Sequence, residues 1–387
     1  PKPSRILCEI LCTTYQRWRQ YLPLCVWVDL VCAFLSLQKL GHRVLHPDLI
    51  NQAQDCDHHL VSSNFQRISS QLIIDIICVD NYCMHIAVCI KSAHQEVYQQ
   101  KMRWFEQGVT DTPCDIVDWV NLPDGYEKYT PVIYGSVKKN RGAAHHKIKS
   151  QVFDNMRPFV MFETPLVHRR ADTNDHSWLR VGVNGFLWDE AHWGFDHMDP
   201  KRKIIDPIEW RKDGDHILIL MQNPGDASLR GADIFEWTEN TAKELRKHTD
   251  RPIRIRPHPL PNKQQRLEQL KKQLSFCEFV ENKLPDNMRP LEQDFENCWC
   301  VVTFSSGSAV DAVLAGIPNI ACDPGNMTWP ISSHSLAMIE TPYTDATSLW
   351  EKQISHCQFS VEELKNGVCW NHIRQSVEFL HGLKASQ

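Results

Sequence analysis

The sequence predicts an α/β protein in which strands alternate with helices and pair in parallel. Short apolar runs with strand-forming composition end in turn residues, as at residues 216–222 and 299–304, and stretches with helical spacing of apolar residues separate them. Strands and helices that alternate in this way form βαβ units, which place the strands of one sheet parallel. The units extend from about residue 214 to residue 325, enough for one Rossmann-like domain.

The first βαβ unit is the clearest in the sequence. Residues 216–222 (HILILMQ) form a predicted strand that ends at the turn signal NPGD. Residues 232–249 follow, with Ile234, Trp237, Ala242 and Leu245 on one helical face and basic residues near the end. Basic residues in the last turn of a helix suit its dipole, so this stretch is predicted to be an amphipathic helix.

The later elements are shorter. Gly316 closes the predicted helix at 308–316, with Pro318 just beyond it, as expected for a helix C-terminus. The remaining predicted strands are residues 252–259, 277–281, 299–304 and 319–323, and the remaining predicted helices are residues 262–275, 290–298, 344–357 and 360–383.

The N-terminal half gives a weaker pattern. Residues 130–140 and 157–167 are each predicted to contain a strand, and the second ends at an acidic residue. Residues 178–195, which are rich in aromatic residues and glycine, are predicted to form an irregular linker or a binding loop. Gly41 is the single glycine between residues 1 and 107, so a glycine-rich nucleotide site is not expected there.

Composition excludes several classes of protein. The net charge of −5 gives no broad electrostatic footprint for nucleic acid, and the 15 cysteines contain no CxxC pair of the kind that zinc sites use. Their odd number and irregular spacing argue against a disulfide framework, so free thiols in a reducing, cytoplasmic compartment are expected. The apolar runs at 21–37, interrupted by Asp29, and at 71–79 are interpreted as core segments, without stable membrane insertion.

The loop after the strand at 299–304 is the main candidate site. Ligands bind at the carboxyl ends of parallel strands, and a helix N-terminus attracts phosphate. The predicted donor-binding residues here are Ser305, Ser306, Gly307, Ser308 and Asp311. The hydroxyl and N–H groups would hold a diphosphate, and the Asp311 carboxylate would accept hydrogen bonds from a ribose. The alternative is that the serines only cap a helix.

Two further strand ends supply candidates. Arg254, Arg256 and His258 lie in RIRPHP, and arginine suits bidentate contact with phosphate. Arg256 and His258 are predicted to act in catalysis, whereas Arg254 is interpreted as a solvated surface charge. The loop NPGDASLRG adds three predicted donor-binding residues, which would close over the donor: Gly225, Ser228 and Arg230. The alternative is that it is an ordinary loop rich in turn residues.

Residues 301–323 resemble the donor-site signature of GT-B glycosyltransferases. Asp311, Ala315–Gly316 and Pro318 match its acidic residue, small pair and G-x-P turn, and RPHP resembles a segment of capsule-polysaccharide and Kdo-type transferases. The resemblance covers about residues 214–340. It implies two Rossmann-like domains with a parallel sheet in each, at residues 1–205 on the acceptor side and 206–345 on the donor side, followed by C-terminal helices at 346–387.

The resemblance also implies a mechanism. GT-B enzymes need no bound metal, so no metal or cofactor is expected and the nucleotide sugar is a substrate. Glu163, at the end of an apolar strand, is the predicted general base for the acceptor hydroxyl. Its rivals are Asp189, Glu190, His192 and Asp196. Trp188, Trp193 and Phe195 would stack on a ring or pack in the core.

Other side chains have weaker candidate roles. His334 and Trp329 follow the last strand of the C-terminal domain, where they would contact the donor. The basic stretch at 138–149 would contact acceptor phosphates or form a solvated loop.

The sequence therefore predicts a glycosyltransferase that moves a sugar from a nucleotide-sugar donor to an unidentified hydroxyl acceptor, which would be a glycan, a lipid or a modified DNA base. More distant similarity to uncharacterised phage transferase-like proteins is a hint of the last of these, and nucleic acid is expected only as acceptor. Nucleotide-sugar 2-epimerases share the architecture and a similar loop. A third alternative is a non-catalytic module that binds a nucleotide or a glycan.

Overall fold

The structure is a computed structural model that describes residues 84–90, 96–118, 129–135, 158–167, 177–193, 199, 201–259, 263–282 and 289–380. All of them belong to one unit of the chain, Met84–Gln387. The two apolar runs at 21–37 and 71–79 lie outside these ranges. Within the ranges, no helix combines the length and the apolar character needed to cross a membrane.

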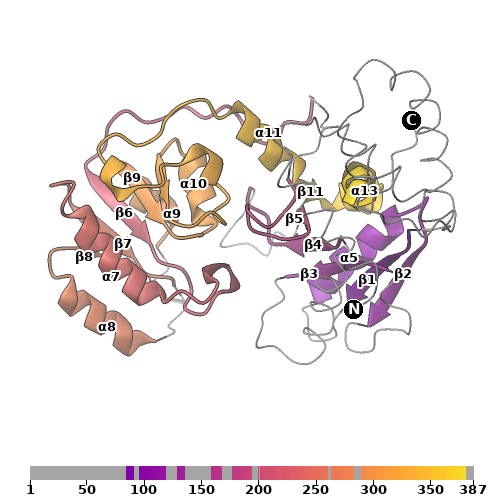
Figure 1. The fold of residues 1–387 in the computed structure, drawn as a ribbon, viewed down its shortest axis with the longest axis horizontal. Coiled ribbons are helices and arrows are strands. Elements are labelled where there is room, and N and C mark those ends of the chain that lie inside the picture. The colour runs from indigo at the N-terminus through magenta and orange to yellow at the C-terminus, as the bar shows by residue number, and fades with distance from the viewer. Residues whose placement is uncertain are drawn as a thin grey trace, which may run out of the picture. The chain divides into compact units, whose positions relative to one another are not determined.

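The C-terminal half forms a parallel sheet of Rossmann type (Figure 1). Its strands lie in the order β10-β9-β6-β7-β8, and every described pair is parallel. The strands are β6 (His216–Leu220), β7 (Ile253–Arg256), β8 (Glu278–Phe279), β9 (Cys298–Thr303) and β10 (Asn319–Ala321). The chain therefore builds outward from β6 in one direction and then returns to β9 on the other side of β6, which makes the β6–β9 boundary the topological switch point.

Helices cover both faces of this sheet because side chains alternate across each strand. Ile217, Ile219 and Ile255 pack with α7 (Ile234–Leu245) and α8 (Gln264–Gln273) on one face. Leu218, Leu220 and Val301 pack with α9 (Leu291–Phe295) and α10 (Ser308–Leu314) on the other. The strands and helices predicted between residues 214 and 325 are all confirmed, with ends shifted by a few residues.

The other sheet is mixed, in the order β11-β5-β4-β3-β1-β2. Strands β1 to β4 pair in parallel, whereas β5 pairs antiparallel with both β4 and β11. The strands are β1 (Ile86–Ile90), β2 (Cys114–Asp118), β3 (Thr130–Tyr134), β4 (Val160–Glu163), β5 (Trp178–Val183) and β11 (Gln358–Ser360). The expected α/β class with a parallel-rich sheet in each half and C-terminal helices is confirmed, and β5 and β11 add an antiparallel edge to this sheet.

The prediction of an irregular linker or binding loop at residues 178–195 is wrong for its first part, which forms β5. Leu179, Val181 and Val183 of β5 are buried and pack against the core of the mixed sheet. A side chain on Gly182 would collide with the carbonyl oxygen of Gly185 and the ring of Trp193. The glycine that suggested a loop is therefore a point where other parts of the chain approach the strand closely.

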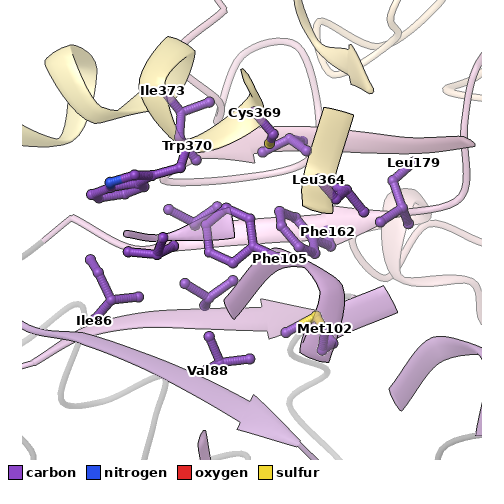
Figure 2. Close-up of a cluster of buried hydrophobic side chains, with 14 of the residues drawn as sticks. Ile86, Val88, Met102, Phe105, Phe162, Leu179, Leu364, Cys369, Trp370 and Ile373 are labelled. Carbon is purple, nitrogen blue, oxygen red and sulfur yellow. The ribbon is translucent and has the colours of Figure 1, made fainter. Parts of the chain in front are cut away.

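The mixed sheet packs one face against α5 (Glu96–Gly108), α12 (Val361–Lys365) and α13 (Val368–Leu380). Figure 2 shows Phe105 of α5 beside Phe162 of β4, and the rings meet edge to face with centroids 5.0 Å apart. Trp370 of α13 contacts Phe105 in the same way at 6.2 Å. The C-terminal helices are therefore part of this core, together with residues far earlier in the chain.

The helix predicted at 360–383 is interrupted. Gly367 adopts a left-handed conformation with φ of +75°, which separates α12 from α13. Ser360 and Glu363 form a capping box that starts α12. The preceding α11 (Ser348–His356) and the short helices η2 (Ala227–Leu229), η3 (Trp329–Ile331) and η4 (Leu336–Met338) complete the described elements.

Candidate functional site

Two loops follow the strands that border the switch point. Residues 221–230 follow β6 and residues 304–308 follow β9, and β6 and β9 are hydrogen-bonded neighbours. Because the strands are parallel, both loops lie at the carboxyl edge of the sheet. Ligands of open α/β sheets bind at this edge, in the crevice at the switch point.

Gln222 joins the two loops through its side-chain amide. Its Oε1 accepts a hydrogen bond from the backbone N–H of Ser305 at 2.8 Å, and its Nε2 donates to the Ser228 hydroxyl at 2.8 Å. The Ser305 hydroxyl donates to the carbonyl oxygen of Ser228 at 2.8 Å. Asp226 accepts from the N–H and the hydroxyl of Ser228. The side chains of Ser305 and Ser228, both predicted to bind donor, are therefore engaged in holding the loops.

The next residues of the β9 loop are more exposed. Ser306 accepts a hydrogen bond from the N–H of Ser308 at 3.3 Å, and Gly307 has helical backbone angles just before α10. Ser306, Gly307 and Ser308 are half-buried, as is Asp311 in the first turn of α10. The structure thus places four of the predicted donor-binding residues together at the switch point, accessible from solvent.

Arg230 lies among three carboxylates. It forms an ion pair with Asp189, and its guanidinium lies 3.8 Å from Glu190 and 3.9 Å from Asp323, which follows β10. The hydrogen bond to Asp189 raises the pKa of Arg230. The backbone N–H of Trp188 also donates to the carbonyl oxygen of Gly325. These contacts place residues 187–190 directly beside the loops of the parallel sheet.

Gly225, in the same loop as Arg230, is exposed, with φ of +79° and open space where a side chain would start. A residue other than glycine would be strained at this φ, so the turn after β6 depends on it.

Arg256 forms an ion pair with Asp294 of α9. Asp294 has 2% of its side chain exposed and also accepts from Arg289 at 2.6 Å. Arg256 further donates to Asn282 at 3.3 Å. Arg254, two residues earlier on the same strand, pairs with the exposed Glu278. These bonds give Arg256 a structural role in the sheet, and its catalytic role stays a prediction.

A pocket opens beside the switch point, at the carboxyl ends of β6, β7 and β8. Phe235, Leu267, Pro257 and Phe279 give it apolar walls, and Gln222 and His258 contribute polar groups. Gln222 is thus shared between the pocket and the loop at 304–308. His258, predicted from its position after β7, lies in the pocket lining together with Asn282, which donates to the carbonyl oxygen of Pro257 at 2.9 Å.

Glu163 ends β4 at the carboxyl edge of the mixed sheet, as predicted. Its Oε1 accepts from the N–H of Thr164 at 2.9 Å. Arg180 is buried and lies directly opposite Glu163 in the antiparallel β4–β5 pair. Residues directly opposite in such a pair present their side chains on the same face.

The comparisons with known proteins give only distant similarity. A scan of protein-family models finds no match, and neither does a search of curated proteins. Among solved structures, KpsC of Thermosulfurimonas dismutans, a beta Kdo 2,7 transferase, is 14% identical with a TM-score of 0.42 over 74% of this chain and 99% of that chain. Its beta Kdo 2,4 transferase is 13% identical with a TM-score of 0.42, over 70% and 90%.

E. coli heptosyltransferase WaaC, solved with ADP-2-deoxy-2-fluoro heptose, is 14% identical with a TM-score of 0.22 and covers 67% of both chains. At these identities and TM-scores, the activities of these proteins are not carried over to this chain.

The aromatic residues of the 186–193 segment divide between two environments. Trp193 is buried and donates its indole N–H to the carbonyl oxygen of Leu187 at 3.3 Å, so it packs in the core. Trp188 is half-buried, and the backbone of His192 bridges to Val183. Phe195 and Asp196, and the basic stretch at 138–149, lie outside the described residues.

Trp329 and His334 stack on each other with ring centroids 3.5 Å apart, and His334 bonds to the carbonyl oxygen of Trp329. The two rings therefore contact each other in this structure, and their contact with the donor stays a prediction. Among the described residues, no three metal-ligating side chains cluster in a way that suits a metal ion.

Sequence reasoning missed Gln222 and Asp323. A glutamine at the end of a strand belongs to no motif, so only the loop contacts identify it. Asp323 is the last residue of NIACD, and its position at the end of a strand could have identified it as a candidate site residue. The pocket walls come from two helices, from β8 and from the segments that follow β6, β7 and β8, so they had no local signature in the sequence.

Proposed function

We propose that this protein is a glycosyltransferase that moves a sugar from a nucleotide-sugar donor to a hydroxyl group of an acceptor. The observation that carries the proposal is the pair of loops at 221–230 and 304–308, which border the switch point of the parallel sheet. Ligands of such sheets bind there. The same stretch of chain carries the residues that resemble a GT-B donor site.

The donor would lie across the carboxyl edge of the sheet. Asp311 is proposed to accept hydrogen bonds from the ribose, and Ser306, Gly307 and Ser308 to donate to the diphosphate. The pocket with Phe235 and Phe279 would take the nucleobase, because its apolar walls suit a planar ring and lie next to the diphosphate site.

Glu163 is the proposed general base. Two other carboxylates, Asp189 and Glu190, are alternative candidates for this role because of where they lie. Asp189 and Glu190 lie beside Arg230 and the donor-side loops. Glu163 is held on its own sheet by Thr164 and faces Arg180. A base must reach the acceptor hydroxyl in the complex, so comparison of Glu163→Gln, Asp189→Asn and Glu190→Gln turnover decides between them. Loss of the general base lowers turnover by about 10²–10⁴-fold.

The leaving diphosphate needs positive charge or N–H donors. Arg230 is the proposed cation, and its three carboxylate neighbours would have to yield part of their hold when the donor binds. Backbone N–H groups of the 304–308 loop are the proposed second source of stabilisation. This scheme uses no metal ion, which a comparison of turnover with and without a chelator checks.

The proposal is tested by incubating the protein with a panel of nucleotide sugars and following each donor by mass spectrometry. A transferase consumes its donor and releases the nucleoside diphosphate or monophosphate, faster when a hydroxyl acceptor is present. An epimerase converts the donor alone into an isomer of the same mass, which chromatography separates. A donor that binds and is never consumed, with any acceptor of a broad panel, would identify a binding module instead.

A further inference from the structure

We infer that Gln222 is a positioning residue that holds the loop after β6 and the loop after β9 together as one phosphate-binding unit. The inference rests on the proposed function for the ligand, but the holding role itself rests only on contacts in the chain. Gln222 is the second residue after the end of β6 and is 6% exposed, as is Ser305 across the switch point. The two residues are 83 positions apart in sequence.

The hydrogen bonds fix one orientation of the glutamine amide. Oε1 faces the backbone N–H of Ser305, which only donates, so an NH₂ group in that place would set two donors against each other. Nε2 faces the Ser228 hydroxyl, which already donates its hydrogen to Asp226 and therefore accepts. The amide oxygen therefore faces a donor, and the amide nitrogen faces an acceptor.

The network also leaves little freedom in either loop. The Ser305 hydroxyl accepts from Gln222 at 3.2 Å and donates to the carbonyl oxygen of Ser228 at 2.8 Å. Ser228 is buried and its N–H is bound by Asp226. Removal of Gln222 therefore leaves a buried backbone N–H without its acceptor, and the lowest-energy response is a shift of the 304–308 loop toward water.

Gln222 also lines the pocket beside the switch point. A ring in the pocket and a phosphate at the 304–308 loop would touch the two sides of one side chain. Movement of the loop would then disturb the phosphate site more than the pocket, whose remaining walls come from α7, α8 and the ends of β7 and β8. The inference therefore assigns Gln222 to positioning of the phosphate site, without direct contact to the reacting atoms.

The test uses the full-length protein and the variant Gln222→Met, which keeps the length of the side chain and removes its hydrogen bonds. Gln264→Met is the matched control, because Gln264 lines the same pocket but bonds to Glu268 on its own helix. Hydrogen–deuterium exchange is measured on peptides that cover 303–309 and 222–231, and affinity is measured for inorganic pyrophosphate.

In Gln222→Met, exchange is expected to rise in both peptides while the peptides of β6 and β9 stay protected, and pyrophosphate affinity is expected to fall by about tenfold, as for one lost hydrogen bond. Gln264→Met is expected to match the wild type in both measurements. Should Gln222→Met fail to fold, Ser228→Ala serves instead: it removes one link, so exchange is expected to rise at 222–231 and stay low at 303–309.

Unchanged exchange at 303–309 in Gln222→Met would overturn the inference, and so would raised exchange with undiminished pyrophosphate affinity. If the wild-type protein binds neither pyrophosphate nor any nucleotide, the proposed function loses its phosphate site. The exchange measurement still decides whether Gln222 holds the loops, so the two failures are distinguishable.

Discussion

Arg256 illustrates how one side chain changes meaning when its partners are known. In the sequence it is an arginine at a strand end, suited to a phosphate. In the structure 11% of its side chain is exposed and its charge is matched by Asp294, which is buried. Arg289 is the second cation on this carboxylate, so loss of Arg256 would leave the buried charge of Asp294 with one ion pair in place of two, and the Arg256–Asp294 pair therefore matters to folding.

The first prediction follows for Arg256. Arg256→Ala is expected to lower the free energy of unfolding by about 1.5–3 kcal/mol, as for the loss of a hydrogen bond to a charged group, because Arg289 still pairs with Asp294. Arg254→Ala is the control, because Arg254 lies on the same strand and pairs with Glu278, whose side chain is 60% exposed. Exposed pairs contribute about 0–1 kcal/mol. Urea unfolding measures both, and near wild-type stability with lost turnover in Arg256→Ala would instead support the catalytic role.

The second prediction concerns Asp311. Asp311→Asn is expected to weaken binding of the nucleotide donor by about 1–3 kcal/mol, because a neutral amide accepts a weaker hydrogen bond from the ribose. Asp213→Asn is the control: Asp213 is exposed and precedes β6, at the opposite edge of the sheet. Calorimetric titration measures the affinities. Equal affinity of Asp311→Asn and the wild type would remove the ribose role.

At the scale of the element, strands that pair with distant segments were the hardest to predict. Strand β11 is three residues long and pairs with β5, which lies about 180 positions earlier in the chain. Neither periodicity nor turn residues encode such a partner. Strand β5 was obscured by Gly182, which accommodates the ring of Trp193. By contrast, β6, β9 and β10 were predicted because each is a short apolar run that is buried almost throughout.

The third prediction concerns the start of β6. His216 is 2% exposed, its Nε2 bonds to the carbonyl oxygen of Asp294, and its Nδ1 faces Arg254. Burial, followed by the charge of Arg254, lowers the pKa of His216 from its usual 6.5. The unfolded chain then binds a proton more readily than the folded chain, so stability is full above pH 6.5 and falls as the pH drops below it, by at most about 1.4 kcal/mol per pH unit.

Unfolding by urea at pH 7.5 and pH 5.5 measures this effect. His216→Gln removes the titrating group and keeps polar atoms, so its loss of stability between the two pH values should be smaller than that of the wild type. An equal loss in both proteins would show that other groups cause the pH dependence.

At the scale of the molecule, the sequence predicted the α/β class and the position of the candidate loop but not the strand order. That order depends on which face each helix covers. Helices α7 and α8 pack on one face and α9 and α10 on the other, so the chain reverses direction across the sheet between β8 and β9. The choice is made by packing of whole helices, which no short motif records. The switch point, and with it the partnership of Gln222 and Ser305, follows from that reversal.

The most direct test of the proposed donor site is a crystal structure of the protein with the nucleotide or nucleotide sugar that it binds most tightly. We expect phosphate density between residues 221–230 and residues 304–308, with the ribose at Asp311 and the base in the pocket of Phe235 and Phe279. Phosphates placed away from these two loops, or the failure of every nucleotide sugar to bind, would contradict it.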